Sequence, residues 1–218
     1  MNIDRNVTRA AQLDTASLSD ALDKCAIPGQ CLGVKPLLPS FKLAGRAFTV
    51  RYCAIDPVNP GTVGDYIDDV PPGAVVVLDN GGRADATVWG DILTMVASQS
   101  GLAGTVIEGA CRDVSLAMEI NYPMFVRHST MRTGKDRVQV DEVNGGVSVG
   151  AIRVNAGDLI VGDADGVLCI PAAVEEKILA IAEEIQAAEQ RIRDDVKAGS
   201  TLKDARSANR YHQLQTKA

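Results

Sequence analysis

The sequence has 218 residues, of which 46% are hydrophobic and 23% charged, and this composition suits a folded globular domain rather than a disordered chain. Its net charge of −6 argues against a protein that works mainly by neutralising nucleic-acid phosphates, because such binding needs a basic surface. No apolar run approaches the roughly 20 residues of a membrane span, and the start of the chain lacks a signal peptide's apolar segment, so we expect a cytoplasmic protein with reduced cysteines.

The first half of the chain predicts alternating helices and strands. A helix capped by Ser17 is expected over residues 17–25, and the alternation of apolar and polar side chains predicts a strand over 45–53. The unbroken apolar run at 74–79 predicts a strand buried on both faces. A Gly-rich loop comes next, followed by a helix at 87–100, a buried strand at 105–109, a short helix at 113–121 and a strand at 124–128. This order predicts a parallel sheet.

Beyond Thr133 the sequence predicts short strands with turn signals, including a hairpin at Asp165-Gly166. Residues 172–197 then predict one long amphipathic helix, whose apolar stripe comprises Val174, Ile178, Ile181, Ile185 and Ile192. We therefore expect one domain over residues 1–218, with its core at about 17–171 and a protruding C-terminal helix.

Two short pairs bracket the predicted helix and strand in the middle of the chain. Gly90-Asp91 and Arg112-Asp113 are separated by 20 residues, about the length of one helix and one strand. Such a spacer returns the chain to the same edge of a parallel sheet, and ligands bind outside the carboxyl ends of parallel strands. The spacing therefore allows both pairs to face one pocket, with free backbone amides at the helix start.

The residue types in these pairs suit a 2-oxo acid. The guanidinium of Arg112 can bind a carboxylate or an enolate oxygen in bidentate fashion, and Asp113 is suited to ligate Mg²⁺. The same residues also fit a plainer interpretation, in which Asp91 favours the helix dipole and Arg112-Asp113 is a surface ion pair with a helix cap.

The pattern GD, 20 residues, then RD, together with "DNGGRADATVWGD", "YPMFVRHS" and "GDLIVGDADGVLCIP", resembles the regulator of ribonuclease activity A family. It resembles most the branch that contains class II pyruvate aldolases acting on 4-hydroxy-4-methyl-2-oxoglutarate. The resemblance spans about residues 17–199. It implies an α/β fold, a three-layer β/β/α swivelling domain, assembled into trimers or hexamers with active sites between subunits.

The resemblance also implies a role for each matched residue. Arg112 would bind pyruvate and stabilise its enolate, and Asp113 would ligate Mg²⁺ or Mn²⁺. Asp91 would hold the waters of the metal, and the amides of Ile92 and Leu93, next to Gly90, would bind the pyruvate carboxylate.

A further metal contact is implied from a neighbouring subunit. An acidic residue of that subunit's C-terminal helix approaches the metal, and Glu189 matches its place, with Glu183 or Glu184 as alternatives. In the loop before the site, Arg83 either holds a second substrate carboxylate or is simply a loop charge. The sequence indicates no proton-transfer group.

The expected function is a divalent-metal-dependent lyase that cleaves a 4-hydroxy-2-oxo acid to pyruvate and also decarboxylates oxaloacetate. The alternative is a non-catalytic protein that binds and regulates an RNA-processing enzyme, as other members of the resembled family do. Among other candidates, Cys111 is expected to be a small buried thiol, and His128 to have a structural role rather than to line the cleft.

Overall fold

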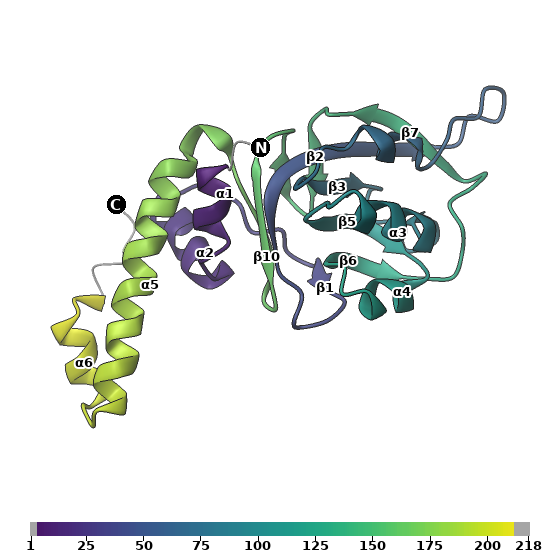
Figure 1. Cartoon of the computed structure of the whole chain (residues 1–218). Coiled ribbons are helices and arrows are strands. Elements are labelled where there is room, and N and C mark those ends of the chain that lie inside the picture. The colour runs from purple at the N-terminus through teal and green to yellow at the C-terminus, as the bar shows by residue number, and fades with distance from the viewer. Residues whose placement is uncertain (1–3, 212–218) are drawn as a thin grey trace.

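A nine-stranded sheet organises the fold of residues 4–211, which the computed structural model describes (Figure 1). Its strands follow the order β1-β6-β5-β3-β2-β10-β11, with β4 added to β5 and β7 added to β2. The strands are β1 (Lys35–Pro36), β2 (Leu43–Ala54), β3 (Val75–Asp79), β4 (Thr87–Trp89), β5 (Gly104–Cys111), β6 (Met124–Ser129), β7 (Val138–Val143), β10 (Leu159–Asp163) and β11 (Gly166–Ile170). A separate hairpin is formed by β8 (Val147–Val149) and β9 (Ile152–Val154).

The helices lie on both sides of this sheet. They are α1 (Arg5–Ala10), α2 (Thr15–Lys24), α3 (Asp91–Gln99), α4 (Val114–Glu119), α5 (Glu175–Lys197) and α6 (Leu202–Ala208), with 3-10 turns at Asp65–Asp69 and Ala172–Val174. Within residues 4–211, no helix combines the length and the apolar character that crossing a membrane requires.

The predicted parallel sheet is present. β2, β3, β5 and β6 run parallel as neighbours, with Val77 of β3 paired to Val106 of β5. All residues of β5 are buried, as expected for a strand covered on both faces. The carboxyl ends of β3, β5 and β6 therefore meet at one edge of the sheet, where α3 and α4 begin.

The strand β2 belongs to two layers of the structure. Its first residues pair with antiparallel β10, and the residues from Ala47 onward pair with parallel β3. Gly45 lies where the strand passes from one layer to the other, and a Cβ there would lie only 2.5 Å from the Gly73 carbonyl oxygen. β2 is accordingly long and strongly curved (Figure 1).

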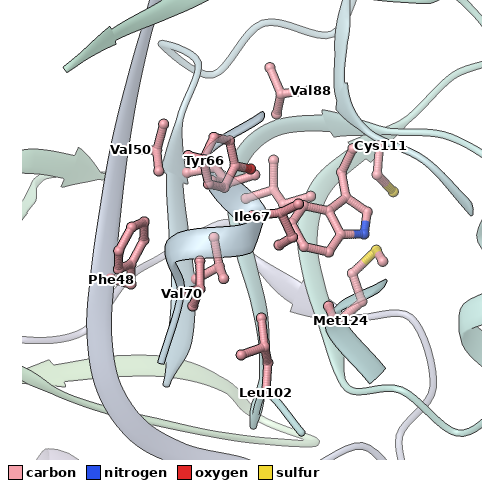
Figure 2. Close-up of a cluster of buried hydrophobic side chains, with 14 of the residues drawn as sticks. Phe48, Val50, Tyr66, Ile67, Val70, Val88, Leu102, Cys111 and Met124 are labelled. Carbon is pink, nitrogen blue, oxygen red and sulfur yellow. The ribbon is translucent and has the colours of Figure 1, made fainter. Parts of the chain in front are cut away.

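Three hydrophobic clusters separate the layers. The first lies between α3, α4 and the parallel strands; Figure 2 shows part of it, including Phe48, Ile67 and Met124. The second fills the opposite face of the sheet, against β8 to β11. The third joins the outer face of β10 and β11 to α1, α2 and α5. The expected α/β architecture with three β/β/α layers is thus confirmed, and the N- and C-terminal helices add an outer layer to it.

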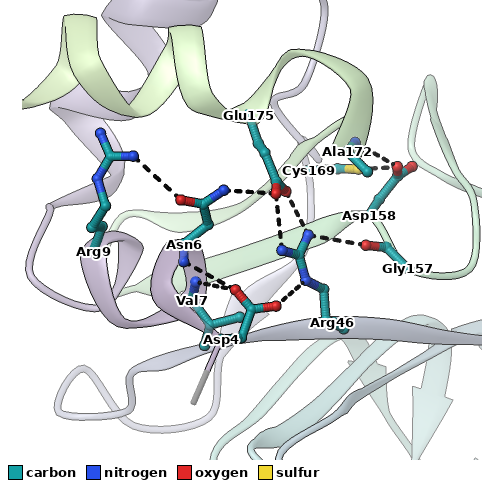
Figure 3. Close-up of polar contacts among 10 residues, drawn as sticks. All are labelled: Asp4, Asn6, Val7, Arg9, Arg46, Gly157, Asp158, Cys169, Ala172 and Glu175. Atoms are coloured by element: carbon teal, nitrogen blue, oxygen red, sulfur yellow. Dashed lines mark hydrogen bonds and ion pairs between the residues drawn. The ribbon is translucent and has the colours of Figure 1, made fainter. Parts of the chain in front are cut away.

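A partly buried ionic network attaches this outer layer to the sheet (Figure 3). Arg46 of β2 donates twice to Glu175, at the start of α5, with one N···O distance of 2.9 Å. It also donates to Asp4, the N-cap of α1, at 2.7 Å. Asn6 of α1 donates to the same Glu175 carboxylate at 2.8 Å. One arginine therefore connects β2 with both terminal helices.

Several local predictions were wrong or incomplete. The helix expected from Thr87 begins at Asp91, because Thr87–Trp89 forms the buried strand β4 alongside β5. The first predicted helix is capped by Asp14, and Ser17 lies inside it and is buried. The helices α1 and α6 were not predicted. The long C-terminal helix agrees with expectation. The predicted hairpin forms too, but its turn is Ala164-Asp165, one residue earlier than expected, and Gly166 begins β11.

Candidate functional site

The pair Gly90-Asp91 is placed at the sheet edge by the short strand β4 and by the loop before it, which hydrogen bonds of Asn80 hold in place. The buried Asn80 donates from its side chain to the Ala86 carbonyl at 3.0 Å and from its backbone to the Glu108 carbonyl at 3.0 Å. The loop therefore returns directly into β4. Gly90 is the N-cap of α3 but offers no side-chain cap, so the first amides of the helix depend on other acceptors.

The pair Arg112-Asp113 lies immediately beyond the carboxyl end of β5. The Arg112 backbone N–H donates to the Trp89 carbonyl at 3.0 Å, which continues the β4–β5 pairing. Asp113 is the N-cap of α4 and has a left-handed backbone, with φ of +54°, a conformation that aspartate tolerates better than most residues. Its Oδ2 lies 3.2 Å from Arg112 Nε, and both side chains are 41% exposed.

The two pairs meet at Gly90. A Cβ placed on Gly90 would lie 3.0 Å from Asp113 Oδ2 and 3.4 Å from Arg112 Nε. The structure therefore brings the two pairs together at one edge of the sheet, as their spacing predicts. The ion pair of the plainer interpretation is present too, but Asp113 forms no side-chain hydrogen bond that caps α4.

A cavity of about 260 Å³ opens at this meeting point. Its walls include five of the expected site residues, which are Gly90, Asp91, Ile92, Leu93 and Arg112. The Ile92 amide donates to the Asp91 carboxylate at 2.8 Å, and the Ile92 side chain is 69% exposed. An acid that binds the helix start would therefore compete with Asp91 for this amide.

Two further segments that the sequence did not predict as part of the site also line the cavity. One is Val63-Gly64, and the other is Thr133–Lys135, which runs beside β4 through the Thr87–Thr133 bridge. A Cβ on Gly134 would lie 2.1 Å from the Thr87 carbonyl oxygen, so only glycine allows this approach. Lys135 thus faces the same cavity as Arg112, which gives the cavity two cationic residues.

The carboxylates of the site suit a hard divalent cation only in part. Asp113 is exposed beside Gly90-Asp91, and one or two carboxylates plus water are a common Mg²⁺ environment. Within residues 4–211, no group of three or more His, Cys, Asp or Glu side chains is arranged to hold a metal. A cation at Asp113 would therefore complete its coordination with water, substrate or a second chain.

Other predicted residues lie outside the cavity. Glu189 is on α5, on the opposite side of the molecule from α3 and α4, and lies 3.5 Å from Arg193 (Figure 1). Of its alternatives, Glu183 pairs with Arg9 at 2.7 Å, and Glu184 is exposed on the same helix. Arg83 pairs with Asp85 on the surface at 2.9 Å.

Two further side chains near the site have no catalytic features in this arrangement. Cys111 is buried beneath Arg112, and burial raises the pKa of its thiol to about 11, so it remains protonated at neutral pH. His128 is exposed at the end of β6 and does not line the cavity.

Comparison with known proteins agrees with this architecture. A family profile described as RraA-like, Aldolase/RraA, matches residues 15–169. Protein DlpA of Legionella pneumophila is 39% identical over 92% of this chain, which spans 33% of DlpA. A putative 4-hydroxy-4-methyl-2-oxoglutarate aldolase of Halalkalibacterium halodurans is 34% identical over 88% of this chain and 90% of its own length.

A solved structure shows the same fold over nearly the whole chain. It is an uncharacterized protein from Pseudomonas syringae pv. tomato with a TM-score of 0.87 and 38% identity, and the match covers 94% of this chain and 99% of that one. On the profile match and these relatives, the chain belongs to the RraA-like, Aldolase/RraA family.

Proposed function

We propose that this protein is a divalent-metal-dependent lyase that cleaves a 4-hydroxy-2-oxo acid to pyruvate and also decarboxylates oxaloacetate. The observation that carries the proposal is the approach of Gly90, which lines the cavity together with Arg112, to Asp113, which lies beside Gly90 but does not line the cavity. This approach gathers an arginine, two carboxylates and a helix start, which are the groups that binding a 2-oxo acid beside a metal requires.

In the proposed mechanism, both reactions break the bond between C3 and C4 of the substrate. In the aldol cleavage, the C4 hydroxyl loses its proton and C4 leaves as a carbonyl compound. In the decarboxylation, C4 leaves as CO₂. In either case the bonding electrons pass into the enolate of pyruvate, and a proton added at C3 then gives the methyl group.

The residues of this chain have separate roles in that mechanism. Arg112 binds the substrate through two N–H groups and stabilises the negative charge that develops on the enolate. The amides of Ile92 and Leu93 bind the carboxylate of the pyruvyl half. Asp113 and Asp91 are the residues that would hold a divalent cation and its water, and such a cation would supply Lewis acidity towards the 2-oxo oxygen. Lys135, rather than the surface-paired Arg83, faces the cavity as the second cation for a second carboxylate.

We further propose that the working form is a homotrimer or hexamer with shared sites. Three apolar side chains in or near the site segments are exposed to solvent: Ile92 at 69%, Met95 at 46% and Met131 at 86%. Such exposure suits a protein interface. A contact between this surface and the α5 helix of a second copy joins two different surfaces, and such contacts form a closed ring when the rotation between copies closes. The contact would bring Glu189 towards Asp113.

The first experiment measures pyruvate release from oxaloacetate and from 4-hydroxy-4-methyl-2-oxoglutarate, coupled to lactate dehydrogenase, with Mg²⁺ or Mn²⁺ and after chelation. We expect release that depends on the metal. Arg112→Ala and Asp113→Ala should each lower kcat/KM by at least about a hundredfold, because the first removes the cation that stabilises the developing negative charge and the second removes the carboxylate that would hold the metal.

Two matched variants sharpen this test. Arg112→Lys keeps the charge but loses the bidentate geometry, so its activity should fall between those of the wild type and Arg112→Ala. Arg153→Ala, an exposed arginine on β9, should behave as wild type. Near-normal turnover in Arg112→Ala would contradict the proposal. A folded wild-type protein that releases no pyruvate with either metal would favour the alternative, a non-catalytic regulator of an RNA-processing enzyme.

A further inference from the structure

The start of α3 is held by one buried hydroxyl group. Thr94 is 1% exposed, and its Oγ1 donates to the Gly90 carbonyl oxygen at 3.0 Å, beside the helical bond from its own amide at 3.1 Å. The same Oγ1 accepts the indole N–H of Trp89 at 2.8 Å. Thr94 therefore connects the last residue of β4 with the N-cap of α3.

Trp89 extends this connection to the second pair. Its carbonyl oxygen accepts the backbone N–H of Arg112 at 3.0 Å. Its ring is stacked on Tyr122, with centroids 6.4 Å apart and planes 7° from parallel, so the indole has little freedom to turn. The hydroxyl of Thr94 thus acts on a residue that contacts both Gly90 and Arg112.

The choice of threonine is informative at this position. Packing alone would be satisfied by valine, which has the same shape, and threonine has no advantage over valine in a helix. Removing the hydroxyl would leave the indole N–H without its acceptor, which is unfavourable because Trp89 is only 2% exposed. A hydroxyl that bonds back to the fourth residue before it also bends the first turn of a helix.

We infer that Thr94 is a positioning residue, which sets the placement of Gly90-Asp91 relative to Arg112-Asp113. Thr94 does not line the cavity, so it acts through Trp89 and Gly90 rather than on the substrate. The consequence for catalysis rests on the function proposed above, whereas the consequence for the geometry of the α3 start does not.

The test compares Thr94→Val with Thr94→Ser, which keeps the hydroxyl. The control is Thr49→Val on β2, which removes the hydroxyl of a fully buried threonine that donates to Gly145 at 2.6 Å, away from the site. Two quantities are measured: amide hydrogen exchange of the peptide that covers residues 89–94, and kcat/KM for Mg²⁺-dependent pyruvate release from oxaloacetate.

We expect faster exchange at 89–94 in Thr94→Val but not in Thr49→Val, together with a loss of at least about tenfold in kcat/KM, since small misplacements of binding groups have large kinetic effects. Thr94→Ser should restore both quantities towards wild type. Thr94→Ala serves as a second variant that cannot overpack the site, and it should follow Thr94→Val.

The possible results distinguish the positioning role of Thr94 from the proposed lyase function. Unchanged exchange in Thr94→Val and Thr94→Ala would overturn the positioning role, whatever the turnover. Equal losses of kcat/KM in Thr94→Val and Thr49→Val would overturn it as well, because the loss would then reflect a general loss of stability. Absence of pyruvate release from the wild type, with the exchange difference present, would contradict the proposed function but support the positioning of the α3 start.

Discussion

At the scale of single residues, Gly90 shows how a site can depend on an absent side chain. Its φ of −146° and ψ of −167° are open to any amino acid, so its backbone conformation does not require glycine. Space is the constraint, because a Cβ would lie 3.0 Å from the Asp113 carboxylate and 3.4 Å from the Arg112 guanidinium. Glycine here keeps the ion pair and the helix start in contact.

Gly90→Ala should therefore reduce activity with little effect on folding. The added methyl group pushes Arg112 and Asp113 away from the helix start, and both side chains can move into solvent because they are 41% exposed. We expect kcat/KM for pyruvate release to fall by at least about tenfold, with a melting temperature close to that of the wild type.

Gly101, just after α3, provides the opposite control. It has a φ of +68° and nothing within 4 Å of an added Cβ, so alanine there strains the backbone without touching the site. Gly101→Ala should lower the free energy of unfolding by roughly 1–2 kcal/mol, and leave kcat/KM unchanged. If Gly90→Ala lost stability and kept its activity, steric control of the site by Gly90 would be wrong.

At the scale of secondary-structure elements, we expect the attachment of α1 and α5 to the sheet to depend on pH. Hydrogen bonds from Arg46 lower the pKa of Glu175 below its usual range, and Arg46 likewise lowers the pKa of Asp4. A carboxyl whose pKa is lower in the folded state stabilises the fold above its unfolded pKa, near 4.3 for glutamate, and loses this effect as the pH falls through the folded value.

We expect Glu175→Gln to lower the free energy of unfolding by about 1–3 kcal/mol at pH 7, because the partly buried Arg46 loses its doubly bonded charged partner. The difference from wild type should shrink as the pH is lowered from 5 to 3, a window set by that unfolded pKa of about 4.3. Urea unfolding at a series of pH values measures both effects. Glu176→Gln, in an exposed ion pair with Arg9, is the control and should change little at any pH.

Some of the strands could be predicted from the sequence, and others could not. Two strands could be predicted from local sequence, because each is a mostly apolar run of residues that is buried on both faces: Val75–Asp79 and Gly104–Cys111. Their parallel order follows from the helix predicted between them. β4 could not be predicted, because three residues next to a helical pattern become a strand only through pairing with β5.

Some residues of the candidate site could likewise be predicted from the sequence, and others could not. Gly90-Asp91 and Arg112-Asp113 were found because strand ends and chain spacing bring them together. Lys135 was not, since its place in the cavity depends on Gly134 fitting against the Thr87 carbonyl. The polar composition of Leu202–Ala208 concealed α6, which begins with a Thr201 cap that accepts the Asp204 amide at 3.2 Å.

At the scale of the whole molecule, the distance between α5 and the cavity makes the shared site testable. The helix α5, which carries Glu189, lies across the molecule from α4, whose N-cap is Asp113, so one chain alone does not bring the two carboxylates together (Figure 1). In the proposed ring, a chain supplies Asp113 to one site and Glu189 to the next. Two different inactive chains can then form one complete site between them.

Mixing Asp113→Ala with Glu189→Gln should therefore restore activity. We expect about a quarter of the sites in an equal, randomly assembled mixture to carry both native residues, and pyruvate release to recover in proportion. The unmixed variants and a mixture prepared without subunit exchange serve as controls, with oligomer mass followed by light scattering. Activity no greater than the sum of the two variants would contradict a site shared through Glu189.

Trp89, whose indole N–H binds Thr94, is also the only tryptophan in the sequence, and it lines the cavity. The fluorescence of the unlabelled protein, excited where only indole absorbs, therefore comes from a single known position. Its ring is 2% exposed, so the native emission should be that of an indole shielded from water. The protein thus contains an intrinsic optical probe at its candidate site, which allows candidate acids to be titrated before any turnover is known.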